Sequence, residues 1–153
     1  MHNAESEPTL SHLDLIIPVW LFTRFLNHSK VEGKRVGEII RLAVAFRRAL
    51  EDARDDPNNT PDLLKRMLLN SNEDVRFTSE MAIKMLEFNM LDQELSFDQV
   101  QDGQAKTIQI PLTPALLADL EQRVRREGFQ DTNSYVFASM MLYEISFGLS
   151  DSS

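Results

Sequence analysis

A short alternating stretch in a chain that otherwise has helical patterns limits the possible folds most strongly. In KTIQIPLTP, residues 106–114, every second residue is apolar, namely Ile108, Ile110 and Leu112. This period of two is typical of a strand with one apolar face. A single strand leaves its backbone N–H and C=O groups unpaired and is not stable in water by itself. The stretch therefore requires a second strand as its partner.

The best candidate for the partner strand is HLDLIIP, residues 12–18, because it belongs to an internal repeat. A shift of 95 residues places its apolar residues on those of KTIQIPLTP, and it places Gly33 on Gly128. Each glycine follows a helical pattern, where glycine commonly ends a helix. We therefore expect residues 13–17 and 107–112 to pair as one antiparallel ribbon.

The rest of the chain has the spacing of amphipathic helices. The pattern predicts helices over residues 19–33, 35–53, 61–70, 73–91, 114–128 and 134–147, with a turn over residues 129–134. A shift of 97 residues aligns the apolar positions of the second and last of these helices. The expected fold class is mainly α, with one short two-stranded antiparallel ribbon over a four-helix core. Methionines at helical spacing are expected in this core, as Met81, Met85, Met140 and Met141.

The same pattern divides the chain into two copies and an insert. The expected segments are a disordered tail over 1–11, a first copy over 12–54, an acidic helical insert over 55–104, a second copy over 105–149, and a tail over 150–153. The sequence leaves open whether the copies pair within one chain or swap between two chains of a homodimer. The apolar stripes of the insert must be buried, either on the four-helix core or on the insert of a second chain. We expect the insert to influence oligomeric state and partner choice.

Composition excludes several classes of protein. The chain has no cysteine, its N-terminus lacks the features of a signal peptide, and its longest apolar run, residues 15–22, is too short to span a bilayer. A cytoplasmic protein without membrane contact is therefore expected. The sequence has no nucleophile elbow, P-loop or dinucleotide-binding glycine run, and its three histidines are not spaced as metal ligands. We expect no enzymatic activity, no cofactor and no metal.

The second copy, TIQIPLTPALLADLEQRVRREGFQDTNSYVFASMM (residues 107–141), resembles the ribbon-helix-helix DNA-binding superfamily. The shared features are a strand, a helix that opens on proline, a glycine, a polar turn, and a helix that begins near Asn-Ser. The first copy is more divergent, and the chain resembles two fused members separated by the insert. The resemblance implies that the ribbon enters the major groove of DNA, which is wide enough to admit it. It suggests a transcriptional repressor or a plasmid or phage maintenance factor.

The resemblance also implies which residues contact DNA. Outward strand side chains would read base edges, and the set here is Thr107, Gln109, His12 and Asp14. Free N–H groups and nearby side chains at the start of each second helix would hold phosphate. That set is Lys34, Arg35, Lys106, Thr132, Asn133 and Ser134. Other residues of the ribbon fit DNA less well, because Pro111 has no donor and Ile16 could contact only a thymine methyl group.

Charge favours a second interpretation. The net charge is −8, which opposes nucleic-acid binding, but the charge is segregated. Residues 12–50 carry seven Lys or Arg against three acidic residues, whereas residues 51–105 carry five against thirteen. Double-stranded DNA is the expected partner of the ribbon. The alternative is a protein-interaction module that keeps the fold but binds a protein partner instead, with the acidic insert as a contact surface.

Overall fold

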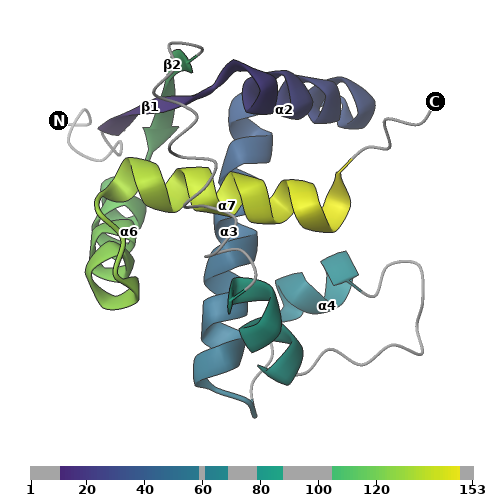
Figure 1. Cartoon of the computed structure of the whole chain (residues 1–153), viewed down its shortest axis with the longest axis vertical. Helices are drawn as coiled ribbons and strands as arrows, with labels where there is room; N and C mark the ends of the chain where they lie inside the picture. Colours follow the sequence, from purple (N-terminus) through teal and green to yellow (C-terminus); the bar gives the residue numbers. More distant parts are fainter. Residues whose placement is uncertain (1–10, 59–60, 69–78, 88–104, 149–153) are drawn as a thin grey trace, which may run out of the picture.

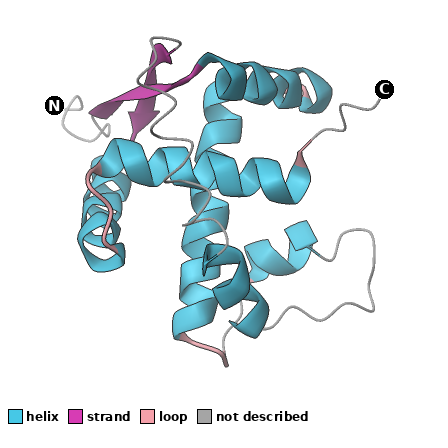
Figure 2. Ribbon diagram, viewed as in Figure 1, coloured by secondary structure: helices cyan, strands magenta, loops and turns pink. Residues whose placement is uncertain are grey.

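The computed structural model describes residues 11–58, 61–68, 79–87 and 105–148 (Figures 1 and 2). In chain order, its elements are β1 (Ser11–Pro18), α2 (Val19–Glu32), α3 (Val36–Asp55), α4 (Asp62–Leu68), β2 (Ala105–Leu112), α6 (Pro114–Glu127) and α7 (Thr132–Phe147). Residues 79–87 are also helical. The expected mainly α architecture with one short antiparallel ribbon is confirmed. We call residues 11–56 the first half and residues 105–148 the second half.

The two strands pair antiparallel, as the repeat predicted, and both belong to one chain. Leu13 lies opposite Ile110 and Leu15 lies opposite Ile108, so the apolar residues of both strands share one face. That face is covered by the helices, and it is buried or half-buried. The residues between them, mostly polar but including Ile16 and Pro111, lie on the opposite face, which is directed away from the helices.

The helices that follow the strands are matched in length and in how they end. Both α2 and α6 have 14 residues, and a glycine with positive φ ends each one: Gly33 at 67° and Gly128 at 83°. Glycine adopts this left-handed conformation without a Cβ clash, which explains the shared stop signal. The start of α6 is fixed by Thr113, whose hydroxyl accepts a hydrogen bond from the N–H of Leu116 at 3.1 Å.

A single large core joins the ribbon to the helices of both halves. Helices α3 and α7 cross at its centre, while α2 and α6 lie at its sides (Figure 1). The deepest members come from every element of the two halves, and they include Leu15, Ile17, Leu21, Phe25, Ile39, Ala43, Leu120, Tyr135 and Met140. Burial of these side chains, at about 1.5–3 kcal/mol for each large one, is what holds the ribbon on the helices.

The described part of the insert packs on the far end of α3 in a second apolar cluster, within one chain, which is the first of the two alternatives that the sequence leaves open. Leu64 of α4 and two residues of the 79–87 helix, Ala82 and Leu86, are buried against Phe46 and Leu50 of α3. Glu80 and Glu87 are exposed, as expected. Residues 69–78 and 88–91, where the sequence also predicts helix, lie outside the described residues.

Two details of the sequence prediction are wrong. Met81 is exposed rather than buried, because the 79–87 helix turns Ala82 toward α3 in its place. The expected turn over residues 129–134 is shorter, because Asp131 caps α7 and Thr132–Ser134 already belong to its first turn.

No described helix combines the length and the apolar character that are needed to cross a membrane.

Candidate nucleic-acid interface

Three cross-strand pairs line most of the outer face of the ribbon: His12 with Pro111, Asp14 with Gln109, and Ile16 with Thr107, and a fourth pair, Pro18 with Ala105, lies at its end. In the first three pairs, all residues except the half-buried Pro111 are exposed. The structure therefore places all four predicted base-reading residues on one accessible surface. These three pairs are mixed in chemistry, with one acid, one amide, one imidazole, one hydroxyl and two apolar groups.

Asp14 and Gln109 lie directly opposite each other at the centre of the ribbon. They are also 95 residues apart, so they are equivalent positions in the sequence repeat. Directly opposed residues place their Cβ atoms about 4.5–5.5 Å apart, so both side chains can act on one ligand group. A glutamine amide can pair with adenine through two hydrogen bonds, and a carboxylate can accept from the amino group of cytosine.

The outer edge of β1 is occupied by Asn133, a residue of α7. Its side-chain Oδ1 accepts a hydrogen bond from the backbone N–H of Ile16 at 2.7 Å, and its Nδ2 donates to the carbonyl of Ile16 at 3.1 Å. An asparagine amide thereby pairs with this residue as a third strand would. Asn133 was predicted to hold phosphate, but its amide group holds the first turn of α7 against the ribbon.

The outer edge of β2 is covered in an equivalent way. Arg41 of α3 donates a hydrogen bond from Nη1 to the carbonyl of Pro111 at 3.3 Å. Pro111 is 95 residues after Ile16, and it has no N–H group. Its partner therefore needs only a donor, which arginine supplies, whereas Ile16 needs both a donor and an acceptor. The N-terminal parts of α3 and α7 thus flank the ribbon near its opposite ends.

The start of α3 exposes two cations beside an internal cap. Lys34 and Arg35 are both exposed and immediately precede the helix. The backbone N–H of Arg35 donates to Oε1 of Glu38 at 3.0 Å. A carboxylate three residues into a helix commonly satisfies this N–H group. The N–H of Lys34 donates to the carbonyl of Ser29 at 3.1 Å. The two cationic side chains are therefore accessible, but both of their backbone donors are already paired.

The start of α7 is more fully occupied. Oδ1 of Asp131 accepts a hydrogen bond from the N–H of Ser134 at 2.8 Å. Ser134 is also buried, so neither its amide nor its hydroxyl is open to a phosphate. Of the residues predicted at this helix start, Thr132 is half-buried and is left as the candidate donor. The carboxylate of Asp131 already occupies the positive, N-terminal end of the α7 dipole, where a bound anion would otherwise be stabilised.

One end of the ribbon carries a cation and exposed apolar groups. Nζ of Lys106 lies 4.9 Å from the centre of the Phe22 ring, within the range of a cation–π contact. Close to Phe22 in the sequence, three apolar residues are exposed to solvent: Ile16 at 49%, Val19 at 42% and Trp20 at 44%. Exposed side chains of this size close to an open strand face are unusual for a purely structural surface.

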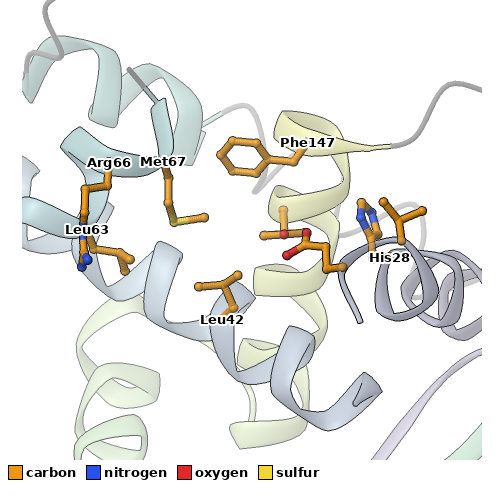
Figure 3. Close-up of a pocket in the computed structure, with 9 residues that line it drawn as sticks. His28, Leu42, Leu63, Arg66, Met67 and Phe147 are labelled. Carbon is orange, nitrogen blue, oxygen red and sulfur yellow. The ribbon is translucent and has the colours of Figure 1, made fainter. Parts of the chain in front are cut away.

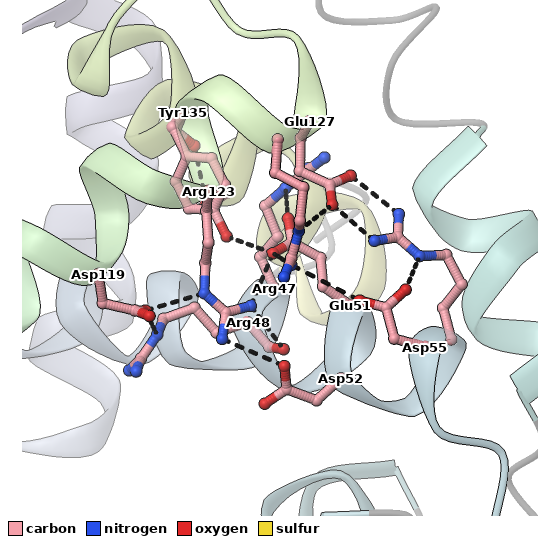
Figure 4. A network of polar contacts seen from close by, with 12 residues as sticks. Arg47, Arg48, Glu51, Asp52, Asp55, Asp119, Arg123, Glu127 and Tyr135 are labelled. Atoms are coloured by element: carbon pink, nitrogen blue, oxygen red, sulfur yellow. Dashed lines mark hydrogen bonds and ion pairs between the residues drawn. The ribbon is translucent and has the colours of Figure 1, made fainter.

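Near the C-terminal end of α3, a buried polar network joins the two halves (Figure 4). Glu51 of α3 is completely buried, and its carboxylate accepts hydrogen bonds from Arg47 at 3.1 Å, Arg123 at 2.8 Å and Tyr135 at 2.9 Å. The guanidinium of Arg47 also lies 4.9 Å from the centre of the Phe129 ring. Buried charges are tolerated when they are paired in this way. Burial and the Glu51 carboxylate raise the pKa of Tyr135, which stays protonated and donates.

The rim of this network consists of ion pairs between α3 and α6 (Figure 4). Asp119 accepts from Arg48 and from Arg123, each at 2.8 Å; burial opposes the charge, but these two cations lower the pKa of Asp119. Arg54 holds both carboxylate oxygens of Glu127, at 2.9 and 2.6 Å, and this hydrogen bonding lowers the pKa of Glu127. Such bidentate pairs are among the stronger ion pairs in proteins.

A second polar contact joins α2 to α7. Oε1 of Glu144 lies 3.0 Å from Nε2 of the buried His28, and Oε2 lies 3.4 Å from Nη1 of Arg24. Beside it is a pocket of about 470 Å³, which Leu42, Met67 and Phe147 also line (Figure 3). Tyr143 faces the same pocket, and burial together with the Glu32 carboxylate raises its pKa to about 12.

Among the described residues, no group of three or more His, Asp or Glu is arranged to hold a metal ion.

No protein-family model matches this sequence, and searches of curated proteins and of solved structures find nothing significantly similar. The interpretation of the surface therefore depends on its own geometry.

Proposed function

We propose that the chain is a single-chain ribbon-helix-helix protein that binds double-stranded DNA with the outer face of its ribbon. Such a protein would act in the cytoplasm as a transcriptional repressor or in plasmid or phage maintenance. The supporting observation is that Asn133 and Arg41 attach the N-terminal parts of α7 and α3 to opposite edges of an exposed ribbon. A ribbon of this width fits the major groove, and the flanking helix starts would then lie near the phosphates on either side.

Side-chain chemistry supports an asymmetric contact. Gln109 and Thr107 can pair with base edges, and the exposed Lys34 and Arg35 would supply the backbone contacts next to α3. The start of α7 has Asp131 at its cap, so the second half would contribute less to phosphate binding. The described helices of the insert, α4 and residues 79–87, pack at the far end of α3, so their exposed acids Glu80 and Glu87 lie away from the ribbon (Figure 1).

A protein partner in place of DNA is the second candidate. The observation that favours it is the combination of Asp14 at the ribbon centre with the exposed Ile16, Val19 and Trp20 at one end. A carboxylate in the major groove is repelled by the phosphates, whereas apolar groups next to a polar strand face are common in protein interfaces. In this case the ribbon face would bind a protein that carries basic and apolar groups.

A direct binding measurement separates the two candidates. Purified full-length chain would be titrated into fluorescently labelled fragments of its source genome at 50 and 200 mM salt. DNA binding predicts a complex whose affinity falls steeply with salt, because counterions are released from the phosphates. If no complex forms at 50 mM salt while circular dichroism shows an intact fold, the DNA proposal is wrong and the protein partner becomes the leading candidate.

A further inference from the structure

Two contacts between α-helices of different halves have the same polarity, whereas the pairs of Arg123 and Arg126 with Glu51 have the opposite one. In the contact between α2 and α7, the cation Arg24 belongs to the first half and the acid Glu144 belongs to the second. In the contact between α3 and α6, the cation Arg48 again belongs to the first half and the acid Asp119 to the second, with 2.8 Å between them. Asp119 lies 95 residues after Arg24, so these two residues occupy equivalent positions of the repeat with opposite charge, and their partners Arg48 and Glu144 are one residue from equivalence at the shift of 97.

Pairing of either half with its own copy would therefore bring like charges together. If α2 took the place of α6 beside the α3 of another first half, Arg24 would face Arg48. If α6 took the place of α2 beside the α7 of another second half, Asp119 would face Glu144. Charge juxtapositions of this kind are a common way to exclude wrong partners.

The buried network and the ribbon edges also disfavour the pairing of two identical halves, independently of those two ion pairs. Arg123 donates to Glu51, whose repeat-equivalent position in the second half is Gly148, 97 residues later. Two second halves would thus remove the buried carboxylate of Glu51 from the largely buried Arg123, which would keep only Asp119 of its own helix, and such a loss is costly. At the ribbon edge, two first halves would leave the N–H of Ile16 facing α3, whose Arg41 has donors but no acceptor.

We propose that these contacts form a pairing code that allows each half to associate only with the other half. The ribbon is then always a hybrid of β1 and β2, with Asp14 opposite Gln109 at its centre. The DNA consequence rests on the proposed function: a hybrid ribbon reads a duplex site without dyad symmetry, and one chain is the complete recognition unit. A site of this kind differs from the palindromic sites that match two-fold symmetric proteins.

The pairing code is tested in the full chain without DNA. Glu144→Arg places two cations at the α2–α7 contact, and it creates an attractive contact with Asp119 of a second chain. We expect a lower melting temperature and a concentration-dependent shift from monomer to dimer by light scattering. Arg24→Glu combined with Glu144→Arg restores opposite charges at these two positions within one chain and should restore the monomer, whereas the contact between His28 and Glu144 stays lost in both variants. Glu121→Arg, at an exposed position of α6, makes the same change in net charge and is the control.

The code is wrong if Glu144→Arg stays monomeric, as the Glu121→Arg control should. It is also wrong if the double variant dimerises as strongly as Glu144→Arg. If Glu144→Arg does not fold, Arg24→Glu, which would attract Arg48 of a second chain, takes its place in this comparison. Selection of binding sites from a random duplex library then tests the consequence for DNA. An asymmetric consensus supports the hybrid ribbon and a palindromic one overturns it, whereas the recovery of no duplex contradicts only the proposed function.

Discussion

The hydroxyl of Tyr135, in the first turn of α7, donates a hydrogen bond of 2.9 Å to the carboxylate of Glu51, near the end of α3. Glu51 is also the partner of Arg47, which is 1% exposed, so one carboxylate compensates a buried cation and a buried hydroxyl. We expect Glu51→Ala to lower the free energy of unfolding by about 3–5 kcal/mol, the typical cost of leaving a buried charge without its partner. Urea denaturation followed by circular dichroism would measure this loss.

The control for this variant is Glu121→Ala, which removes an exposed carboxylate from α6. Surface changes of this kind usually alter stability by no more than about 0.5 kcal/mol. A loss for Glu51→Ala as small as that of the control would mean that the buried network does not stabilise the fold.

The Asn133 side chain is expected to protect the edge of β1. Asn133→Ala removes both hydrogen bonds to the backbone of Ile16, and should cost about 1 kcal/mol for each bond. The specific readout is hydrogen exchange at the amide of Ile16, which should become much faster while the amides in the middle of α3 stay protected. Asn27→Ala, at an exposed position of α2, is the matched control and should leave the exchange unchanged. Equal exchange rates in both variants would contradict the assignment of Asn133 as an edge residue.

Gln109 is expected to contribute to base recognition if the ribbon binds DNA. Gln109→Ala should weaken binding to a selected duplex by about 1–3 kcal/mol, the usual value of a bidentate contact with adenine. Binding to unrelated duplexes should change little, because base contacts add nothing there. Gln122→Ala, at an exposed site on α6, is the control for titrations by fluorescence anisotropy. An equal loss of affinity for all duplexes would show that Gln109 does not read bases.

Lys34 and Arg35 are expected to act on the phosphate backbone. Replacement of either residue with alanine should weaken binding to every duplex by a similar factor. Each substitution should also reduce the slope of log affinity against log salt by about 1, because about one fewer counterion is released. Lys84→Ala, on the exposed face of the insert helix, is the matched control. A salt slope that stays the same in the Lys34 and Arg35 variants would place the DNA elsewhere.

The Arg54–Glu127 pair should make stability depend on acid pH. The hydrogen bond from Arg54 lowers the pKa of Glu127 from its ordinary value of 4.5, so in acid the unfolded state binds this proton more readily than the folded state. The contribution of the pair is therefore complete above pH 4.5 and is lost as the pH falls through the lower folded pKa. Glu127→Gln should destabilise the protein at pH 7, and its melting temperature should approach that of the wild type toward pH 3. Glu121→Gln should show no such convergence. A constant difference between wild type and Glu127→Gln would exclude this role.

Much of the fold could be predicted from periodicity because ribbon and helices are set by local spacing. The repeat identified β1 as the partner of β2, since a shared strand register and the stops at Gly33 and Gly128 rarely coincide by chance. The outward residues of the ribbon followed from the same alternation, which requires no knowledge of the packing. Asp131 and Glu38 could also have been found, because an acid at a helix start and a glutamate three residues in are capping signals.

The roles of Asn133 and Glu51 could not be predicted in this way, because both depend on contacts between distant segments. Arg47 and Glu51 are four residues apart, a spacing that on sequence grounds indicates an exposed ion pair along a helix. Only the packing of α6 and α7 over that face turns the pair into a buried network. Met81 shows the same limit, since a shift of one residue around the helix axis decides that Ala82 is buried instead.

The placement of both strands in one chain also affects how the surface responds to dilution. A ribbon assembled from two separate chains dissociates at low concentration, so its amount falls with the square of the protein concentration. Here β1 and β2 are connected covalently, and the effective concentration of each strand for the other does not depend on the number of molecules in solution. The occupancy of any partner of this face should therefore follow the first power of protein concentration, and the complete ribbon should persist in a cell that holds only a few copies of the chain.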